Sequence, residues 1–254
     1  MDLTDFVNRM GYGVRSRLRV SAPAWKRTAR RWEPLLARLA PAAAARVQQL
    51  RDEYDLEAWP RLSTPRELHE NLFWLDVLTS ALPRARSCGP ALDVGSKNGS
   101  YLPALHAHAP VPWDLVELDA HRRYADLSTR RAHGESMCRA FAGCRYHATS
   151  VTQLEGTYAL ITWFLPFVRL PPLVAWGLPT RFFAPQALLA HVASRLQAPG
   201  TLFIVNQGEK EAEEQHALLS RLGLPFRSVS EVPRTLSPFV APRFGFVVEK
   251  PAAR

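Results

Sequence analysis

The sequence has 254 residues, 47% of them hydrophobic and 22% charged, with a formal net charge of +9. This length suits one domain with an appendage, and no apolar run approaches the roughly 18 residues that a membrane-spanning helix needs. Three cysteines are too few and too odd in number for a disulfide framework; they are Cys88, Cys138 and Cys144. The first residues include Asp2 and Asp5 and lack the apolar stretch of a secretory signal. We therefore expect a cytoplasmic protein without a transmembrane segment.

The positive charge is concentrated near the N-terminus. Residues 1–46 contain ten Arg or Lys residues against three acidic ones, a balance of +7, while the remaining chain contributes only +2. A uniformly basic face for nucleic acid is therefore not indicated for the rest of the protein.

Residues 2–20 carry apolar side chains at helical spacing with arginines between them, which predicts an amphipathic helix weakened by Gly11 and Gly13. Aromatic and basic residues then interleave from Trp25 to Trp32. One interpretation is that the basic segment, residues 1–46, binds RNA or an anionic membrane surface. The other is a cap whose apolar side docks on the domain while its arginines stay in water. We favour the cap.

Strands and helices alternate over the rest of the chain. Pro41 is expected to open a helix that reaches residue 58, and Thr64 to cap a helix that ends near Pro83. The alternation predicts a mostly parallel sheet with helices on both faces. The strands are expected to end near residue 92 and to span 113–119, 145–151, 158–164, 201–206, 226–232 and 244–249, with helices at 100–106, 124–139, 186–196 and 209–222.

The first of these strands leads into a glycine turn, A-L-D-V-G-S-K-N-G over residues 91–99. In a strand–turn–helix unit, backbone N–H groups at the helix N-terminus face a ligand, and glycines allow the tight turn and the close approach. About 20 residues later, the second strand ends at Asp119, the spacing of a carboxylate that binds ribose hydroxyls. Glu117 is the alternative candidate for this role, because residues two positions apart on a strand point to the same side of the sheet.

Residues 93–99 resemble the glycine turn of the class I S-adenosylmethionine (SAM)-dependent methyltransferases, D/E-x-G-x-G-x-G, except that Lys97 replaces the central glycine. The resemblance covers roughly Leu82 to Lys250 and implies a doubly wound, mostly parallel, seven-stranded Rossmann-like α/β sheet with an antiparallel last strand. Residues 85–254 would form this SAM-binding domain, and residues 1–84 a basic N-terminal helical cap. The nicotinamide pattern G-x-G-x-x-G is absent.

The resemblance also implies a SAM site. Members of the family commonly have an acidic residue at the end of the third strand, where this chain has none and where Ser150 or Thr149 could accept the adenine hydrogen bond instead. A helix before the first strand often closes over the cofactor, so Asn71 and Trp74 could reach it, although core packing suits Trp74 better. The expected cofactor-binding residues are Asp93, Gly95, Ser96, Lys97, Gly99, Asp119, Ser150, Val151 and Thr162.

An aromatic, proline-rich stretch at residues 165–185 follows the fourth strand and is expected to exclude a regular helix. It predicts either an aromatic-walled acceptor pocket or a stiff packing loop. Strand alternation lets only one of Trp163 and Phe164 face a pocket from a given face of the sheet. The expected substrate-binding residues are Trp163, Phe164, Phe167 and Trp176.

Methyl transfer from a sulfonium is an in-line displacement that depends on positioning, so the lack of a recognisable catalytic group does not count against it. His147, Glu209 and His121 are candidate bases, but no catalytic residue is assigned. His133, Cys138, Cys144 and His147 lack the close Cys pairs of structural zinc sites, and no metal site is expected. Three functions remain open: a methyltransferase for a small-molecule acceptor, which we favour, one for RNA or protein guided by the basic N-terminus, and a non-catalytic binding module.

Overall fold

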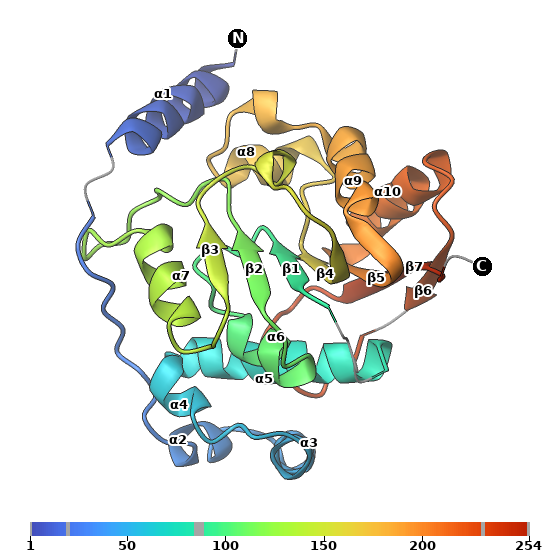
Figure 1. Ribbon diagram of the computed structural model, residues 1–254. Coiled ribbons are helices and arrows are strands. Elements are labelled where there is room, and N and C mark those ends of the chain that lie inside the picture. Colours follow the sequence, from blue (N-terminus) through green and yellow to red (C-terminus); the bar gives the residue numbers. More distant parts are fainter. Residues whose placement is uncertain (1, 19–20, 84–88, 230–231, 253–254) are drawn as a thin grey trace.

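The computed structural model describes residues 2–18, 21–83, 89–229 and 232–252. Its centre is a seven-stranded sheet with the order β3-β2-β1-β4-β5-β7-β6 (Figure 1). Strands β1 to β5 are parallel to one another, and β7 is antiparallel to both β5 and β6. This arrangement confirms the doubly wound α/β fold with an antiparallel last strand. The strands are β1 (Ala91–Val94), β2 (Trp113–Val116), β3 (Arg145–His147), β4 (Tyr158–Phe164), β5 (Leu196–Gln207), β6 (Phe226–Val229) and β7 (Arg243–Lys250).

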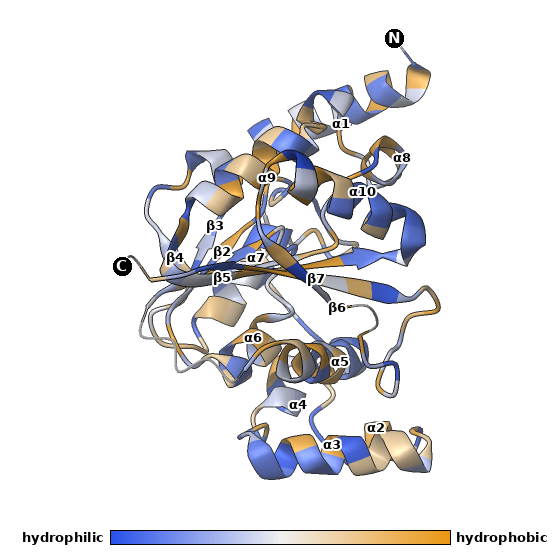
Figure 2. Ribbon diagram, turned by 90° about the vertical axis from the view of Figure 1, so that its right-hand side faces the viewer, coloured by the Kyte–Doolittle hydropathy of each residue, from blue (hydrophilic) through white to orange (hydrophobic). Residues whose placement is uncertain are grey.

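Helices cover both faces of the sheet (Figure 2). On one face lie α5 (Pro65–Ala81) and α6 (Leu102–His108), and on the other lie α9 (Pro185–Ser194) and α10 (Gly208–Arg221). Successive strand residues point to opposite faces, so Ala91 belongs to the core beneath α5, and Leu92 to the core beneath α9 and α10. With apolar side chains on both faces, the strands are buried as expected for a parallel sheet.

The N-terminal part contains α1 (Leu3–Arg17), α2 (Glu33–Leu36), α3 (Pro41–Glu53) and α4 (Trp59–Leu62). The expected cap of α5 is confirmed, because Thr64 and Glu67 form a capping box with Pro65 at the first helical position. Eleven residues of α5 are buried, and the apolar ones among them share the core with the sheet. The division at residues 84 and 85 stays a prediction, since residues 84–88, including Cys88, lie outside the described residues.

Several expected boundaries are wrong. Helix α7 (Arg130–Cys138) begins at its Thr129 cap and not at residue 124, and the strands β2 and β3 end at Val116 and His147. The expected turn at Pro199 and Gly200 lies within β5. Residues 230–231, in the expected sixth strand, lie outside the described part of the chain.

The stretch at residues 165–185 is more regular than its prolines suggest. It contains α8 (Leu170–Ala175) and the 3₁₀ helix η2 (Thr180–Phe182). Pro171 and Pro172 lie in the first turn of α8, where the missing N–H groups would have no partner within the helix. Proline therefore starts this helix, and the expectation that it excludes one is wrong.

Helix α1 forms as expected, but its docked side is the reverse of the expected one. Asp5 is buried and Arg15 is 18% exposed at its side chain, whereas apolar residues such as Leu3 and Val7 are 75% and 57% exposed. The interpretation that the apolar side of a cap docks on the domain is therefore wrong. Of the described helices, none combines the length and apolarity needed to span a membrane.

Candidate functional site

The glycine turn after β1 is held against β2 by backbone hydrogen bonds. The N–H groups of Gly95 and Ser96 both donate to the carbonyl oxygen of Val116, at 2.9 and 3.0 Å. Gly95, Lys97 and Gly99 have φ angles of 74°, 53° and 70°. Lys97 thus adopts the left-handed conformation that its position requires, even though a glycine would do so without strain. The turn therefore keeps its shape at the one position where the sequence departs from the methyltransferase pattern.

Glu117 connects this turn to the end of β2. Its two carboxylate oxygens accept hydrogen bonds from the backbone N–H groups of Lys97, at 2.8 Å, and Asp119, at 2.7 Å. The side chain is buried, and this burial raises the pKa of Glu117. Nη1 of Arg130 is 3.5 Å from Oε1 of Glu117, longer than a normal hydrogen bond, so each oxygen retains a lone pair for a further donor.

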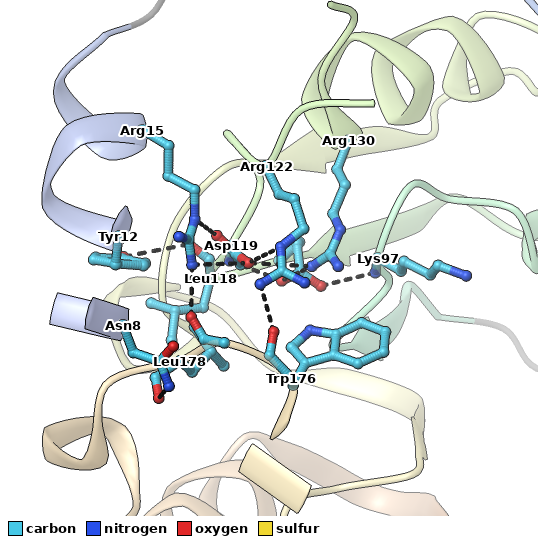
Figure 3. A network of polar contacts seen from close by, with 12 residues as sticks. Asn8, Tyr12, Arg15, Lys97, Leu118, Asp119, Arg122, Arg130, Trp176 and Leu178 are labelled. Carbon is cyan, nitrogen blue, oxygen red and sulfur yellow. Dashed lines mark hydrogen bonds and ion pairs between the residues drawn. The ribbon is translucent and has the colours of Figure 1, made fainter. Parts of the chain in front are cut away.

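Asp119 lies at the centre of a cluster of arginines (Figure 3). Its carboxylate is 2.6 Å from Nε of Arg15, 2.9 Å from Nε of Arg122 and 3.6 Å from Nη1 of Arg130. Only 1% of its side chain is exposed. The carboxylate is therefore already paired with positive charge from three elements of the chain.

The polar side of α1 docks on the stretch at residues 165–185. The side-chain amide of Asn8 donates to the carbonyl oxygens of Val174 and Leu178, at 3.0 and 3.2 Å, and Thr180 N–H donates to Asp5, at 2.8 Å. In Figure 3, Asn8 points from α1 toward Leu178, Tyr12 toward Leu118 and Arg15 toward Asp119. Helix α1 is thus attached by hydrogen bonds, ion pairs and one ring contact, between Tyr12 and Phe182, while its apolar side chains stay outside.

Beside these groups lies a cavity of about 370 Å³ at the carboxyl ends of the parallel strands. This edge of the sheet, near the point where the strand order reverses, is the usual ligand site of open α/β sheets. Its lining comes from the glycine turn, the end of β2 and residues 149–151, and from aromatic residues between β4 and η2 together with α10. The lining includes Gly95, Lys97, Tyr101, Glu117, Thr149, Ser150, Val151, Trp163, Phe164, Phe167, Trp176, Phe182, Glu211 and Gln215.

Comparisons with known proteins bear on the fold. No family model matches the chain, and no curated protein matches it by sequence. A SAM-dependent methyltransferase from Clostridium acetobutylicum ATCC 824 superposes with a TM-score of 0.50 at 10% identity, covering 72% of this chain and 92% of that one. The chain has the fold of the class I SAM-dependent methyltransferases.

Two further structures with this methyltransferase fold are similar at lower scores. The plantazolicin methyltransferase BpumL, in complex with SAH, has a TM-score of 0.48 at 12% identity and covers 86% of this chain and 97% of its own. A SAM-dependent methyltransferase from Aquifex aeolicus has a TM-score of 0.47 at 13% identity, with 63% and 81% covered.

Within this methyltransferase fold, the cavity brings together eight of the thirteen site residues expected from the sequence. The eight that line it are Gly95, Lys97, Ser150, Val151, Trp163, Phe164, Phe167 and Trp176. Asp93, Ser96, Gly99, Asp119 and Thr162 are outside its described lining. The ligand contacts of all thirteen stay predictions.

Trp163 and Phe164 lie on opposite faces of the sheet, as strand alternation requires. Both rings nevertheless line the cavity. Strand β4 ends at Phe164, so the cavity extends around the end of the strand and meets both faces. Phe164 also stacks on Trp74, with ring centroids 4.1 Å apart.

The helix before the first strand supports the turn without lining the cavity. Trp74 is fully buried, as its expected core role requires. The side-chain amide of Asn71 donates to the carbonyl oxygens of Glu67 and Ser100, both at 2.8 Å, and its oxygen accepts from Ala104 N–H at 3.1 Å. Asn71 thus fastens α6 to α5. It is outside the described cavity lining, and its expected contact with the cofactor stays a prediction.

The cavity contains polar residues that sequence patterns did not reveal. The carboxylate of Glu211 accepts from Gln207 N–H at 3.1 Å, and burial raises the pKa of Glu211. Gln215 is 1% exposed, and its side-chain nitrogen has no hydrogen-bond partner among the described residues. Glu211 and Gln215 are four residues apart, which places them on the same side of a helix, and this spacing was the one sequence signal that could have indicated the pair. The earlier candidate bases His121, His147 and Glu209 are not among the described lining residues.

The histidines and cysteines considered for zinc have separate partners. His133 is 2.8 Å from Oγ of Ser128, His147 is 2.9 Å from Asp114, and Cys144 Sγ accepts from Trp113 N–H. In the described ranges, no three His, Cys, Asp or Glu residues are grouped as metal ligands. Burial raises the pKa of Cys138 to about 12, so its thiol stays protonated at neutral pH.

Asp93 is the buried acid at the start of the turn. Thr162 donates to its carboxylate at 2.7 Å, and burial raises the pKa of Asp93 from 3.8 to about 7. The folded protein therefore holds this proton more tightly than the unfolded chain does. The resulting contribution to stability is complete below pH 3.8 and is lost as the pH rises through about 7.

We expect Asp93→Asn, which keeps the acceptor oxygen and cannot ionise, to gain stability relative to wild type as the pH rises from 4 to 8, by about 1 kcal/mol or more. Chemical denaturation of both proteins across this range measures the difference. A difference in unfolding free energy that does not change with pH would show that Asp93 does not titrate in this way.

Proposed function

We propose that this protein is a SAM-dependent methyltransferase with a small-molecule acceptor. The observation that carries the proposal is the single cavity of about 370 Å³ that extends from the glycine turn and Glu117 to the aromatic residues after β4. A cofactor bound at the first end and an acceptor at the second would meet inside one enclosure. The methyltransferase fold supports the same conclusion.

The polar end of the cavity fits SAM. Glu117 presents carboxylate oxygens with free lone pairs beside the glycine turn, which suits the two hydroxyls of a ribose. Thr149, Ser150 and Val151 would form the adenine side, with hydroxyl groups in place of the usual carboxylate. We propose Glu117 as the ribose ligand and assign Asp119 to the arginines that already surround it.

The other end fits an acceptor of modest size with apolar or aromatic surface. Trp163, Phe164, Phe167, Trp176 and Phe182 supply its walls. Aromatic faces also favour a nearby cation, as a sulfonium is.

The chain's contribution to the reaction is to hold the acceptor in line with the methyl group and to keep water out. SAM supplies the electrophilic methyl group when it is bound. Glu211, whose pKa burial raises, is the acid–base group at the acceptor end, and it would accept a proton from an acceptor that must lose one. Gln215 would orient the acceptor through its unpaired N–H groups.

The experiment has two stages. Calorimetric titration with SAM is expected to show one site per chain, and incubation with methyl-labelled SAM and cell extract is expected to place the label in the small-molecule fraction. Label in RNA or protein would contradict the proposed acceptor class. SAM binding without transfer to any fraction would identify a non-catalytic binding module, and no SAM binding would refute the proposal altogether.

A further inference from the structure

Helix α1 presents an apolar face to solvent. Its apolar side chains recur every three or four residues and therefore lie on one side of the helix. All of them are large, and all are about half exposed or more: Leu3 75%, Phe6 46%, Val7 57%, Met10 55% and Val14 51%. Leu18, which caps the end of the helix, is 53% exposed. A surface helix of a globular protein normally turns such a face to the core.

The opposite side of α1 cannot exchange places with this face at low cost. It holds the side chains that bond to the body of the protein, namely Asp5, Asn8, Tyr12 and Arg15. Rotating the helix would separate Arg15 from Asp119 and expose buried polar partners without replacing their bonds. The apolar face therefore remains available for something outside this chain, as contiguous exposed apolar surfaces often are.

Charge indicates what that partner is. At the exposed positions of α1 and its N-cap, Arg9 and Arg17 outnumber Asp2, while Asp5 is buried with its carboxylate 3.7 Å from Arg9. Farther along the same basic segment, Trp25 is 70% exposed, and Arg27 is exposed as well. An apolar helical face accompanied by arginine and tryptophan matches the layered chemistry of a lipid surface, with acyl chains beneath anionic head groups. A second copy of this chain would bring another basic segment toward the first and would be repelled.

We propose that α1 binds an anionic lipid surface, lying in the plane of the interface with its apolar face inserted. The polar side would keep its contacts with Asp119 and with residues 174–180, so the body of the protein would be held at the lipid surface without rearrangement. Such binding combines apolar burial with electrostatic attraction and weakens with salt.

The test is sedimentation of the full chain with vesicles. Vesicles of phosphatidylcholine and phosphatidylglycerol are expected to carry the protein into the pellet, and vesicles of phosphatidylcholine alone to carry much less. The double variant Val7→Glu/Val14→Glu, which places charge in the apolar face, should bind the anionic vesicles at least about tenfold more weakly. Its melting temperature should stay near that of wild type, because both positions are exposed.

The matched control is Ala42→Glu/Ala45→Glu, which adds the same charge at exposed positions of α3 in the same basic segment. It should retain most of the binding. Met10→Gln, which changes no charge, supplies a second variant and should also weaken binding.

Three results would overturn the proposal. The first is a failure to bind anionic vesicles at low salt, whether or not the protein binds RNA instead. The second is equal loss in the α1 and α3 variants, which would reflect net charge alone. The third is a wild-type dimer that Val7→Glu/Val14→Glu dissociates, which would assign the face to a second copy.

Discussion

Replacing Glu117 by glutamine is expected to weaken SAM binding by about 10- to 100-fold while leaving most of the fold intact. A hydrogen bond to a charged group contributes about 1.5–3 kcal/mol, and this carboxylate is the one that lines the polar end of the cavity. Glutamine fills the same volume but has only one acceptor oxygen for the two backbone N–H groups that Glu117 now binds. Titration calorimetry measures the affinity, and thermal unfolding shows how far the turn is disturbed.

The comparison that decides between the two acids is Asp119→Asn in the same assay. Because Asp119 is paired with arginines and is absent from the described cavity walls, its replacement should change SAM affinity less than that of Glu117. If Asp119→Asn lost more affinity while Glu117→Gln bound like wild type, the ribose ligand would be Asp119, as the spacing in the sequence first suggested.

Asp119→Asn is expected to act mainly on stability. It leaves Arg130, which is 3% exposed, without one of its two carboxylate partners, and removes the ion pairs of Arg15 and Arg122. Removing one partner of a buried ion pair typically costs about 3 kcal/mol or more of stability. The ion pairs of Arg15 and Arg122 contribute less to this loss, because both side chains are partly exposed. We expect a loss of about 2 kcal/mol or more in the free energy of unfolding, measured by chemical denaturation.

The same variant should loosen α1, because Arg15 joins the end of this helix to the body. Limited trypsin digestion should cut the segment before residue 20 faster in Asp119→Asn than in wild type. Of the ion pairs of Asp119, Arg15→Gln removes only the one with α1. It should reproduce the faster digestion with a smaller loss of stability. Unchanged digestion in both variants would show that the ion pair does not hold α1 in place.

The sequence predicted the elements whose signals are local. The apolar run at residues 158–164 is β4 with the same bounds, and Thr64, Pro65 and Glu67 place the start of α5. The glycine turn was also predicted, from the pattern of residues 93–99. The pattern predicted the turn although Lys97 replaces its central glycine. A non-glycine residue can adopt the left-handed conformation when surrounding hydrogen bonds hold it there, as they hold Lys97.

The choice between Glu117 and Asp119 could not be made from spacing. Strand alternation places both on one side only while the strand continues, and β2 ends at Val116. Beyond that point, Glu117 turns toward two backbone N–H groups and Asp119 toward arginines, one of which is 104 residues away in the sequence. No local pattern contains such a partner.

The side of α1 that docks on the protein could not be predicted from the periodicity of its apolar residues, for a related reason. A period of 3.6 residues shows that a helix has two unlike sides but not which side docks. Here the docking surface offers backbone carbonyls of residues 174–178 and the carboxylate of Asp119, so polar side chains are the better match.

The stack between Phe164 and Trp74 limits how the acceptor range of this protein can be altered. Phe164 is a cavity wall and at the same time part of the core packed against α5, so a smaller residue there would enlarge the pocket and leave a void beneath it. Phe167 and Trp176 line the same space from the segment outside the sheet, and Trp176 is 37% exposed. Substrate engineering and natural divergence alike should therefore proceed through these two positions, with Phe164 held fixed.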